Sequence, residues 1–192
     1  MVKELLSLIG IAIAIYAYVP YFRGIWRGET KPHVFSWFLW GVLTGIGWAA
    51  QYAENAGPGA WITGFTSLMC LIVAVIAFRQ GEKNITTSDW VSFIAALCSI
   101  PLWYITKDPL WAVILITVID ALAFYPTFRK SWHKPEQEVT LTYTLSGVKF
   151  ALALPALENF TLTTALYPAS LVVMNFGFVA MVLARRKTET VL

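Results

Sequence analysis

Apolar residues gather in blocks separated by short polar stretches. Each block comes close to the roughly 20 residues that a helix needs to cross a bilayer. The hydrocarbon core offers no water to backbone N–H and C=O groups, so apolar runs of this length are expected to be helical. We predict seven transmembrane helices, at Glu4–Phe22, Val34–Ala53, Gly59–Phe78, Trp90–Ile105, Leu110–Phe128, Thr140–Leu157 and Leu162–Ala184.

The composition supports the same interpretation. Hydrophobic residues make up 58% of the 192 positions and charged residues 13%, whereas a soluble domain carries roughly 25% charged residues. Seven crossings of about 20 residues each use most of the chain. Loops and tails remain, but no separate soluble catalytic domain. We therefore expect an all-α, polytopic integral membrane protein whose surroundings are the lipid bilayer.

The Lys and Arg residues between the blocks are divided unequally between the two sides of the predicted membrane. One side holds only Lys3 and Lys107, and the other holds eleven. Cytoplasmic loops retain the excess of positive charge, so this bias predicts an outer N-terminus and a cytoplasmic C-terminus, in the plasma (inner) membrane. The net charge of +3 then has a topological use, and we expect no nucleic-acid partner. The first block precedes its positive charges, which argues against a cleaved signal peptide.

The chain matches itself at an offset of 106 positions. The segment PYFRGIW, from Pro20, aligns with PTFRKSW, from Pro126. Further along, the same offset pairs Leu39 with Leu145, Gly41 with Gly147 and Arg79 with Arg185. Each copy covers three helices, and the odd helix between them gives both copies the same orientation. We predict a first three-helix repeat at 1–79, a linker with the fourth helix at 80–106, a second, parallel repeat at 107–185 and a cytoplasmic tail at 186–192.

This three plus one plus three arrangement resembles the SWEET and PQ-loop superfamily of small-solute transporters, as does the Pro that precedes a basic loop in each repeat. The sequence departs from the family at its Pro-Gln pair, because Tyr21 follows Pro20 and Thr127 follows Pro126. A Pro removes a backbone donor and weakens its helix locally. Pro20 and Pro126 are therefore either static kinks or a pair of hinges, which the resemblance implies would serve a cytoplasmic gate.

Three polar side chains lie deep in the second repeat. Asp120, Lys149 and Asn175 are nine or ten residues from the first residue beyond the cytoplasmic end of their blocks, at Arg129, Val139 and Arg185. This separation places them roughly 14 to 15 Å into the bilayer, near its midplane. Ionisable residues at this depth are costly and mark a candidate functional site. We expect Asp120 and Lys149, on consecutive antiparallel helices, to form an ion pair that either lines a solute cavity or fixes packing. Asn175 resembles the Asn with which SWEET proteins hydrogen-bond their substrate.

Trp48 and Gln51, three positions apart on the second helix, are the preferred pocket candidates in the first repeat. Side chains at this spacing share a helix face, and an aromatic ring can stack on a sugar-like or ring-bearing solute. Contact of Trp48 with lipid is the alternative. Cys70 and Cys98 lie within blocks, without metal-ligand spacing, and are interpreted as small apolar residues.

These features predict a transporter of a small polar solute, sugar-like or vitamin-like, that works by alternating access around a midplane site. The sequence contains no nucleotide-binding loop, HExxH motif or nucleophile elbow, so we predict no catalytic residues, no metal and no cofactor, and we expect no enzyme. A membrane-embedded receptor of the same fold is the main alternative, and an intramembrane enzyme a weaker one. A retinal-type photoreceptor would need a Lys in Leu162–Ala184, which has none. The expected partner is a small-molecule solute, and assembly into a homo-oligomer stays open.

Overall fold

The computed structural model describes residues 1–28, 32, 34–80, 87–133, 135 and 140–189. The all-α prediction is confirmed, because an α-helix occupies each of the predicted apolar blocks. In chain order the α-helices are α1 (Val2–Trp26), α2 (Val34–Ala53), α3 (Gly59–Gln80), α4 (Thr87–Thr106), α5 (Pro109–His133), α6 (Thr140–Ala156) and α7 (Leu162–Glu189).

Three helices extend four or five residues beyond the C-terminal ends of their predicted apolar blocks. α1 runs through Pro20 to Trp26, α5 runs through Pro126 to His133, and α7 ends at Glu189 rather than Ala184. Apolar character marks where a helix leaves the hydrocarbon, and a helix can continue into the polar region beyond it. Pro20 is exposed, and neither Pro ends its helix. Their function as hinges stays a prediction.

Three of the described helices are long and apolar enough, by length and composition, to cross a membrane: α1, α3 and the Leu162–Lys187 part of α7. Phe93–Thr106 and Pro109–Phe124 are shorter apolar helices. Large apolar side chains also lie exposed on the outside of every helix, for instance Leu5, Tyr52, Val75, Ile105, Leu122, Leu141 and Val173. Such an apolar outer surface suits lipid rather than water. The integral-membrane character is therefore supported for the described part of the chain.

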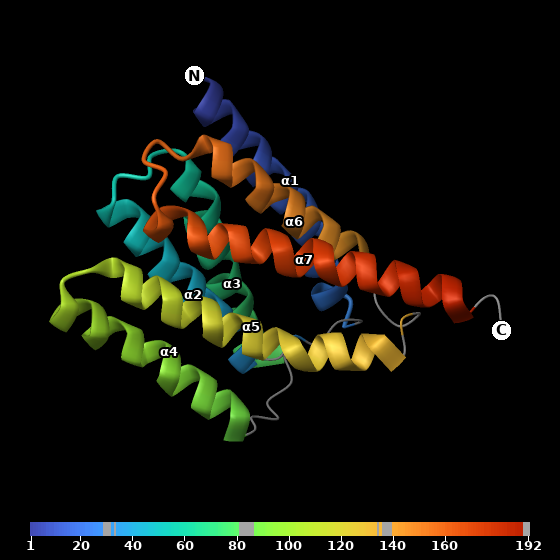
Figure 1. Ribbon diagram of the computed structural model, residues 1–192. Coiled ribbons are helices and arrows are strands. Elements are labelled where there is room, and N and C mark those ends of the chain that lie inside the picture. The colour runs from blue at the N-terminus through green and yellow to red at the C-terminus, as the bar shows by residue number, and fades with distance from the viewer. Residues whose placement is uncertain (29–31, 33, 81–86, 134, 136–139, 190–192) are drawn as a thin grey trace.

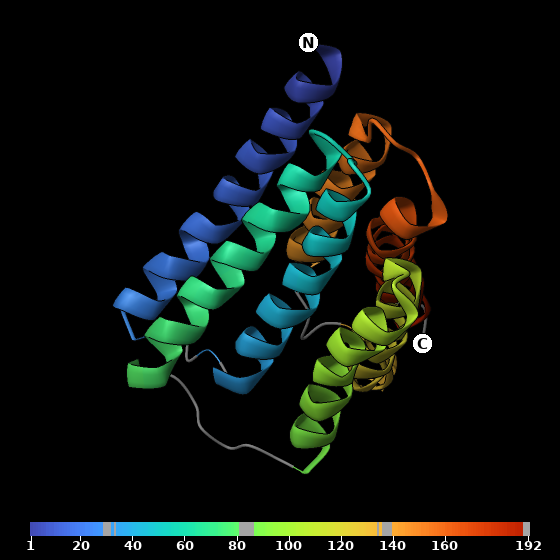
Figure 2. The same cartoon turned by 90° about the vertical axis from the view of Figure 1, so that its left-hand side faces the viewer.

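The helices pack in two groups of three. In the first, α3 contacts both α1 and α2 and lies between them (Figure 2). In the second, α7 contacts both α5 and α6 and lies between them (Figure 1). The groups meet where α1 packs on α6, α2 on α5, α3 on α6 and α2 on α7. Helix α4 packs on α5 and α2 at the edge of the bundle (Figure 1).

The core runs along the contact between the two groups. Its largest cluster joins Leu43 of α2, Ile116 of α5 and Tyr167 of α7, all nearly fully buried. A second cluster joins Ile62 of α3 with Phe150 of α6. Gly47 permits the close approach of α2 to α7, since a Cβ there would lie 2.7 Å from a ring carbon of Tyr167. Small residues at such crossings are typical of helices packed in membranes.

Hydrogen bonds join the two groups at the end where Met1 lies. Lys3 Nζ donates to the Leu157 carbonyl at 2.7 Å. The Glu158 backbone N–H donates to the Ala56 carbonyl at 2.8 Å, and Asn159 Nδ2 donates to the Glu54 carbonyl at 2.9 Å. The turn between α2 and α3, which includes Gly57 at φ 64°, is thereby fixed against the turn between α6 and α7. This end of the bundle is closed by direct contacts.

Candidate functional site

Lys149 of α6 is buried at the contact between the two groups, with 5% of its surface exposed. Its Nζ donates a hydrogen bond of 3.1 Å to the Thr66 hydroxyl of α3. That hydroxyl donates in turn to the Ile62 carbonyl of its own helix, at 2.8 Å. The ammonium also lies 4.8 Å from the ring centroid of Phe150 and 6.0 Å from that of Tyr18, distances within the range of cation–π attraction. Lys149 is thus partnered by a hydroxyl and aromatic rings.

Asp120 of α5 is equally buried, at 5% exposure. Within the described residues, its carboxylate makes no hydrogen bond and no ion pair. The predicted ion pair between Asp120 and Lys149 is therefore wrong. The prediction assumed that consecutive helices are neighbours, but α7 lies between α5 and α6. Because α7 lies between α5 and α6, Asp120 and Lys149 do not meet.

Cys70 of α3 lies beside Tyr18 of α1. Its Sγ lies 3.6 Å from the Tyr18 hydroxyl in a hydrogen bond, and it is within electrostatic range of both Lys149 and Asp120. Tyr167 of α7 is within electrostatic range of Asp120 and Cys70 as well. The interpretation of Cys70 as only a small apolar residue therefore missed its polar surroundings. We call Tyr18, Thr66, Cys70, Asp120 and Lys149 the polar cluster.

Asn175 is buried on α7, and its Nδ2 donates to the Leu171 carbonyl one turn earlier, at 2.7 Å. Leu171 packs against both core clusters, on the α5 side and on the α6 side. Within the described residues, Asn175 makes no hydrogen bond to Asp120 or Lys149, and its amide oxygen accepts none. Its proximity to solute therefore stays a prediction.

Trp48 and Gln51 do not line one pocket. Gln51 is 1% exposed and its Nε2 donates to the Thr164 carbonyl of α7 at 2.8 Å, whereas Trp48 is 42% exposed. Three residues turn a helix by about 300°, which leaves side chains about 60° apart. On α2 this angle is enough to place Gln51 on the buried side of the helix and Trp48 on its outer side. The Gln51 Oε1 is buried with no partner in the described part of the chain.

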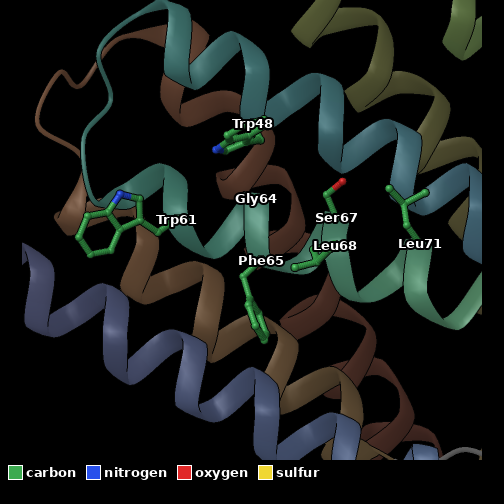
Figure 3. A pocket seen from close by; sticks show the side chains of 7 residues that line it. All are labelled: Trp48, Trp61, Gly64, Phe65, Ser67, Leu68 and Leu71. Carbon is green, nitrogen blue, oxygen red and sulfur yellow. The ribbon is translucent and has the colours of Figure 1, made fainter.

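Trp48 lines a shallow groove on the outer face of α2 and α3, together with Trp61, Phe65 and Leu68 (Figure 3). The groove has a volume of about 380 Å³. Its Ser67 hydroxyl already donates to the Gly41 carbonyl of α2, at 2.8 Å. The surroundings of Trp48 match the alternative of lipid contact, and its assignment to the solute site is not supported.

Aromatic side chains cluster near the proline of each group. Tyr18 contacts the rings of Phe22 and Trp37, with centroids 6.1 Å apart in both cases. Phe124 contacts Phe128 and Tyr143, at 5.2 and 5.9 Å. Each member of the first set lies 106 positions before its counterpart in the second, the offset of the sequence repeat. Equivalent positions thus make equivalent ring contacts.

Comparisons with protein-family models, with curated proteins and with solved structures find no match. In the described residues, no three His, Cys, Asp or Glu side chains gather to hold a metal ion. The polar cluster combines one cation, one carboxylate, two hydroxyls and a thiol in an apolar interior. These groups can donate and accept hydrogen bonds.

Thr66 and Tyr18 were not expected in the site. A Thr or Tyr in an apolar helix carries no charge and, in the sequence, looks like any other tolerated polar residue. The available signal was the 106-position offset, which aligns Thr66 with Val172 and Tyr18 with Phe124. Neither of these two hydroxyl groups has a counterpart at the aligned position.

Proposed function

We propose that the chain is a seven-helix transporter of a small polar solute, in which two parallel three-helix repeats alternate access to a site between them. The proposal follows the resemblance to the SWEET and PQ-loop superfamily, and it places the protein in the plasma (inner) membrane. The observation that carries it is the matched packing of the two groups of helices around a buried polar cluster.

The packing supports a twofold relation between the groups. When α1 is exchanged with α5, α2 with α6 and α3 with α7, every pair of these helices that packs together is replaced by another pair that packs together. The pair α1 and α6 becomes α5 and α2, and the pair α3 and α6 becomes α7 and α2. The matched aromatic contacts obey the same exchange. Two like halves facing each other across a central site are the usual basis of alternating access.

The polar cluster supports a site at this contact. The Lys149 to Thr66 hydrogen bond joins α6 to α3, and Asp120 is buried on α5. Each charged group costs at least about 2.5 kcal/mol at the centre of a membrane helix. A role that uses both charges at the surface between two moving halves accounts for their presence better than packing alone, for which apolar residues suffice.

The hydrogen bonds at the Met1 end are consistent with one state of an alternating-access cycle, in which this end is closed. The bonds from Lys3, Glu158 and Asn159 cross between the two halves at the Met1 end, which the charge bias predicts to face outward. Pro20 and Pro126 lie toward the other end. In one state of such a transporter, the end near Pro20 and Pro126 would be open while hydrogen bonds keep the Met1 end closed. In the other state, the Met1 end would be open and the proline end closed.

The test is uptake into proteoliposomes that contain the purified chain, across a panel of sugars, vitamins, nucleosides and amino acids. Saturable, protein-dependent flux of at least one solute supports the proposal. Saturable binding without flux would favour a receptor, and chemical conversion of a solute would favour an enzyme. Liposomes that contain heat-denatured protein provide the baseline.

A further inference from the structure

Lys149 and Asp120 both lack a partner of opposite charge among the described residues, although each is about 95% buried. A buried charge without a counter-charge is strongly disfavoured. Two such groups of opposite sign, on α5 and α6 with α7 packed between these helices, would each be stabilised by a ligand that carries the complementary charge.

We propose that the solute is a zwitterion, with its anionic group bound by Lys149 beside Thr66 and its cationic group bound by Asp120. This inference rests on the proposed transport function and names the class of solute. It identifies the two buried charges as separate anchors of one molecule rather than as partners of each other.

The Lys149 end has the donors that a carboxylate needs. An ammonium has three N–H donors, and within the described residues Thr66 accepts one of them. Two donors remain for the solute. The ring centroids of Phe150 and Tyr18 lie 4.8 and 6.0 Å from the ammonium, and Lys149 is buried. Charge-assisted hydrogen bonds in such surroundings are stronger than those between neutral groups.

The Asp120 end suits an ammonium. A carboxylate only accepts hydrogen bonds, through two oxygens, and within the described residues no protein donor uses either one. Within the described residues, no basic side chain forms an ion pair with Asp120. A cationic group of the solute would supply the missing positive charge.

Charge balance favours a zwitterion over the alternatives. An anion would compensate Lys149 and leave Asp120 alone, a cation would do the reverse, and a sugar would compensate neither. A zwitterion leaves the loaded site neutral. Its passage also carries no net charge, so the membrane potential, about 2.3 kcal/mol per charge for each 100 mV, does no work on it.

The experiment measures binding to the purified full chain in nanodiscs by calorimetry. The probes are alanine, β-alanine and γ-aminobutyrate, which vary the spacing of the two charges. Lactate and alaninamide each lack one charge of alanine, and glucose is uncharged. We expect one of the three zwitterions to bind most tightly. Removal of either charge should weaken binding by about ten- to 100-fold, which corresponds to one charge-assisted hydrogen bond.

Two variants assign the ends. Lys149→Gln should bind alanine and alaninamide about equally, because the carboxylate has lost its partner. Asp120→Asn should bind alanine and lactate about equally, for the corresponding reason. Lys107→Gln and Asp108→Asn make the same chemical changes at exposed positions of the turn between α4 and α5 and should leave all ratios unchanged. The analogue series in the unmodified protein does not depend on the folding of any variant.

The outcomes separate this inference from the transport proposal. Binding or flux of glucose, with no preference for any zwitterion over its singly charged analogues, overturns the zwitterion and leaves transport intact. Equal ratios in Lys149→Gln and in the unmodified chain overturn the assignment of Lys149. Absence of flux for every solute of the proteoliposome uptake panel counts against transport itself.

Discussion

Within the described residues, the Lys149 ammonium has one hydrogen-bond acceptor, the Thr66 hydroxyl, and the contribution of this bond to stability can be tested. Thr66→Val removes its hydrogen-bond acceptor at nearly constant volume, and an unsatisfied buried polar group costs about 1–3 kcal/mol, more for a charged one. We expect Thr66→Val to lower the free energy of unfolding by at least this amount. Lys149→Met in the same chain should recover most of the loss, because the unsatisfied group is then gone.

Thr44→Val is the matched control. The Thr44 hydroxyl is also buried, but it donates only to carbonyls of its own helix, at Trp40 and Gly41. Its removal leaves no charge unsatisfied. Unfolding in mixed micelles should show a small effect for Thr44→Val, and an equal loss in the two Thr variants would contradict the importance of the Lys149 contact.

At the scale of the helices, close approach is set by glycines at particular crossings. A Cβ on Gly59 would lie 2.7 Å from the Leu157 backbone nitrogen and 2.8 Å from the Ala153 carbonyl oxygen. Backbone atoms cannot turn aside as side chains do, so α3 and α6 would have to separate. We expect Gly59→Ala to destabilise the protein by about 1–3 kcal/mol.

Gly177 on α7 provides the opposite case. Nothing lies within 4 Å of a Cβ built there, and Ala is favoured over Gly in a helix interior by up to about 1 kcal/mol. Gly177→Ala should leave thermal stability in detergent unchanged or raise it. A lower melting temperature for Gly177→Ala than for Gly59→Ala would show that the helix spacing described for this bundle is incorrect.

At the scale of the whole molecule, transport by two moving halves requires that the Met1 end open. Ala56 and Glu158 lie on different halves and share a backbone hydrogen bond. A disulfide between Ala56→Cys and Glu158→Cys should stop solute flux on oxidation and restore it on reduction, while each single variant stays insensitive. Full flux in the oxidised double variant would rule out opening at this end.

The orientation of the whole chain is predicted from its charges and can be tested with a reagent that does not cross the membrane. Cysteines at Glu54 and Glu158 should react with a membrane-impermeant maleimide in intact cells, and those at Arg27 and His133 should react only after permeabilisation. The structure places the first two in turns at the Met1 end and the last two at the ends of α1 and α5. The reverse labelling would invert the predicted topology.

The sequence by itself determined the all-α class and the approximate limits of each helix, because hydrocarbon leaves the backbone no other way to satisfy its polar groups. It also identified Asp120 and Lys149 as buried, because charges are rare and costly at such depth. Only the tertiary structure decided what they contact. Chain order suggested that α5 and α6 are neighbours, but α7 packs between them, so Lys149 binds Thr66.

The same limit applies to Trp48 and Gln51. Their spacing places them near one another on α2, but the packing of α3 and α7 decides which part of that face is buried. Gln51 reaches α7, and Trp48 covers Gly64 on the outer side of α3. A pattern of apolar residues predicts which segments form membrane-spanning helices, because that property depends on the composition of one chain segment. The neighbours of a side chain depend on contacts between distant segments, which only the folded bundle brings together.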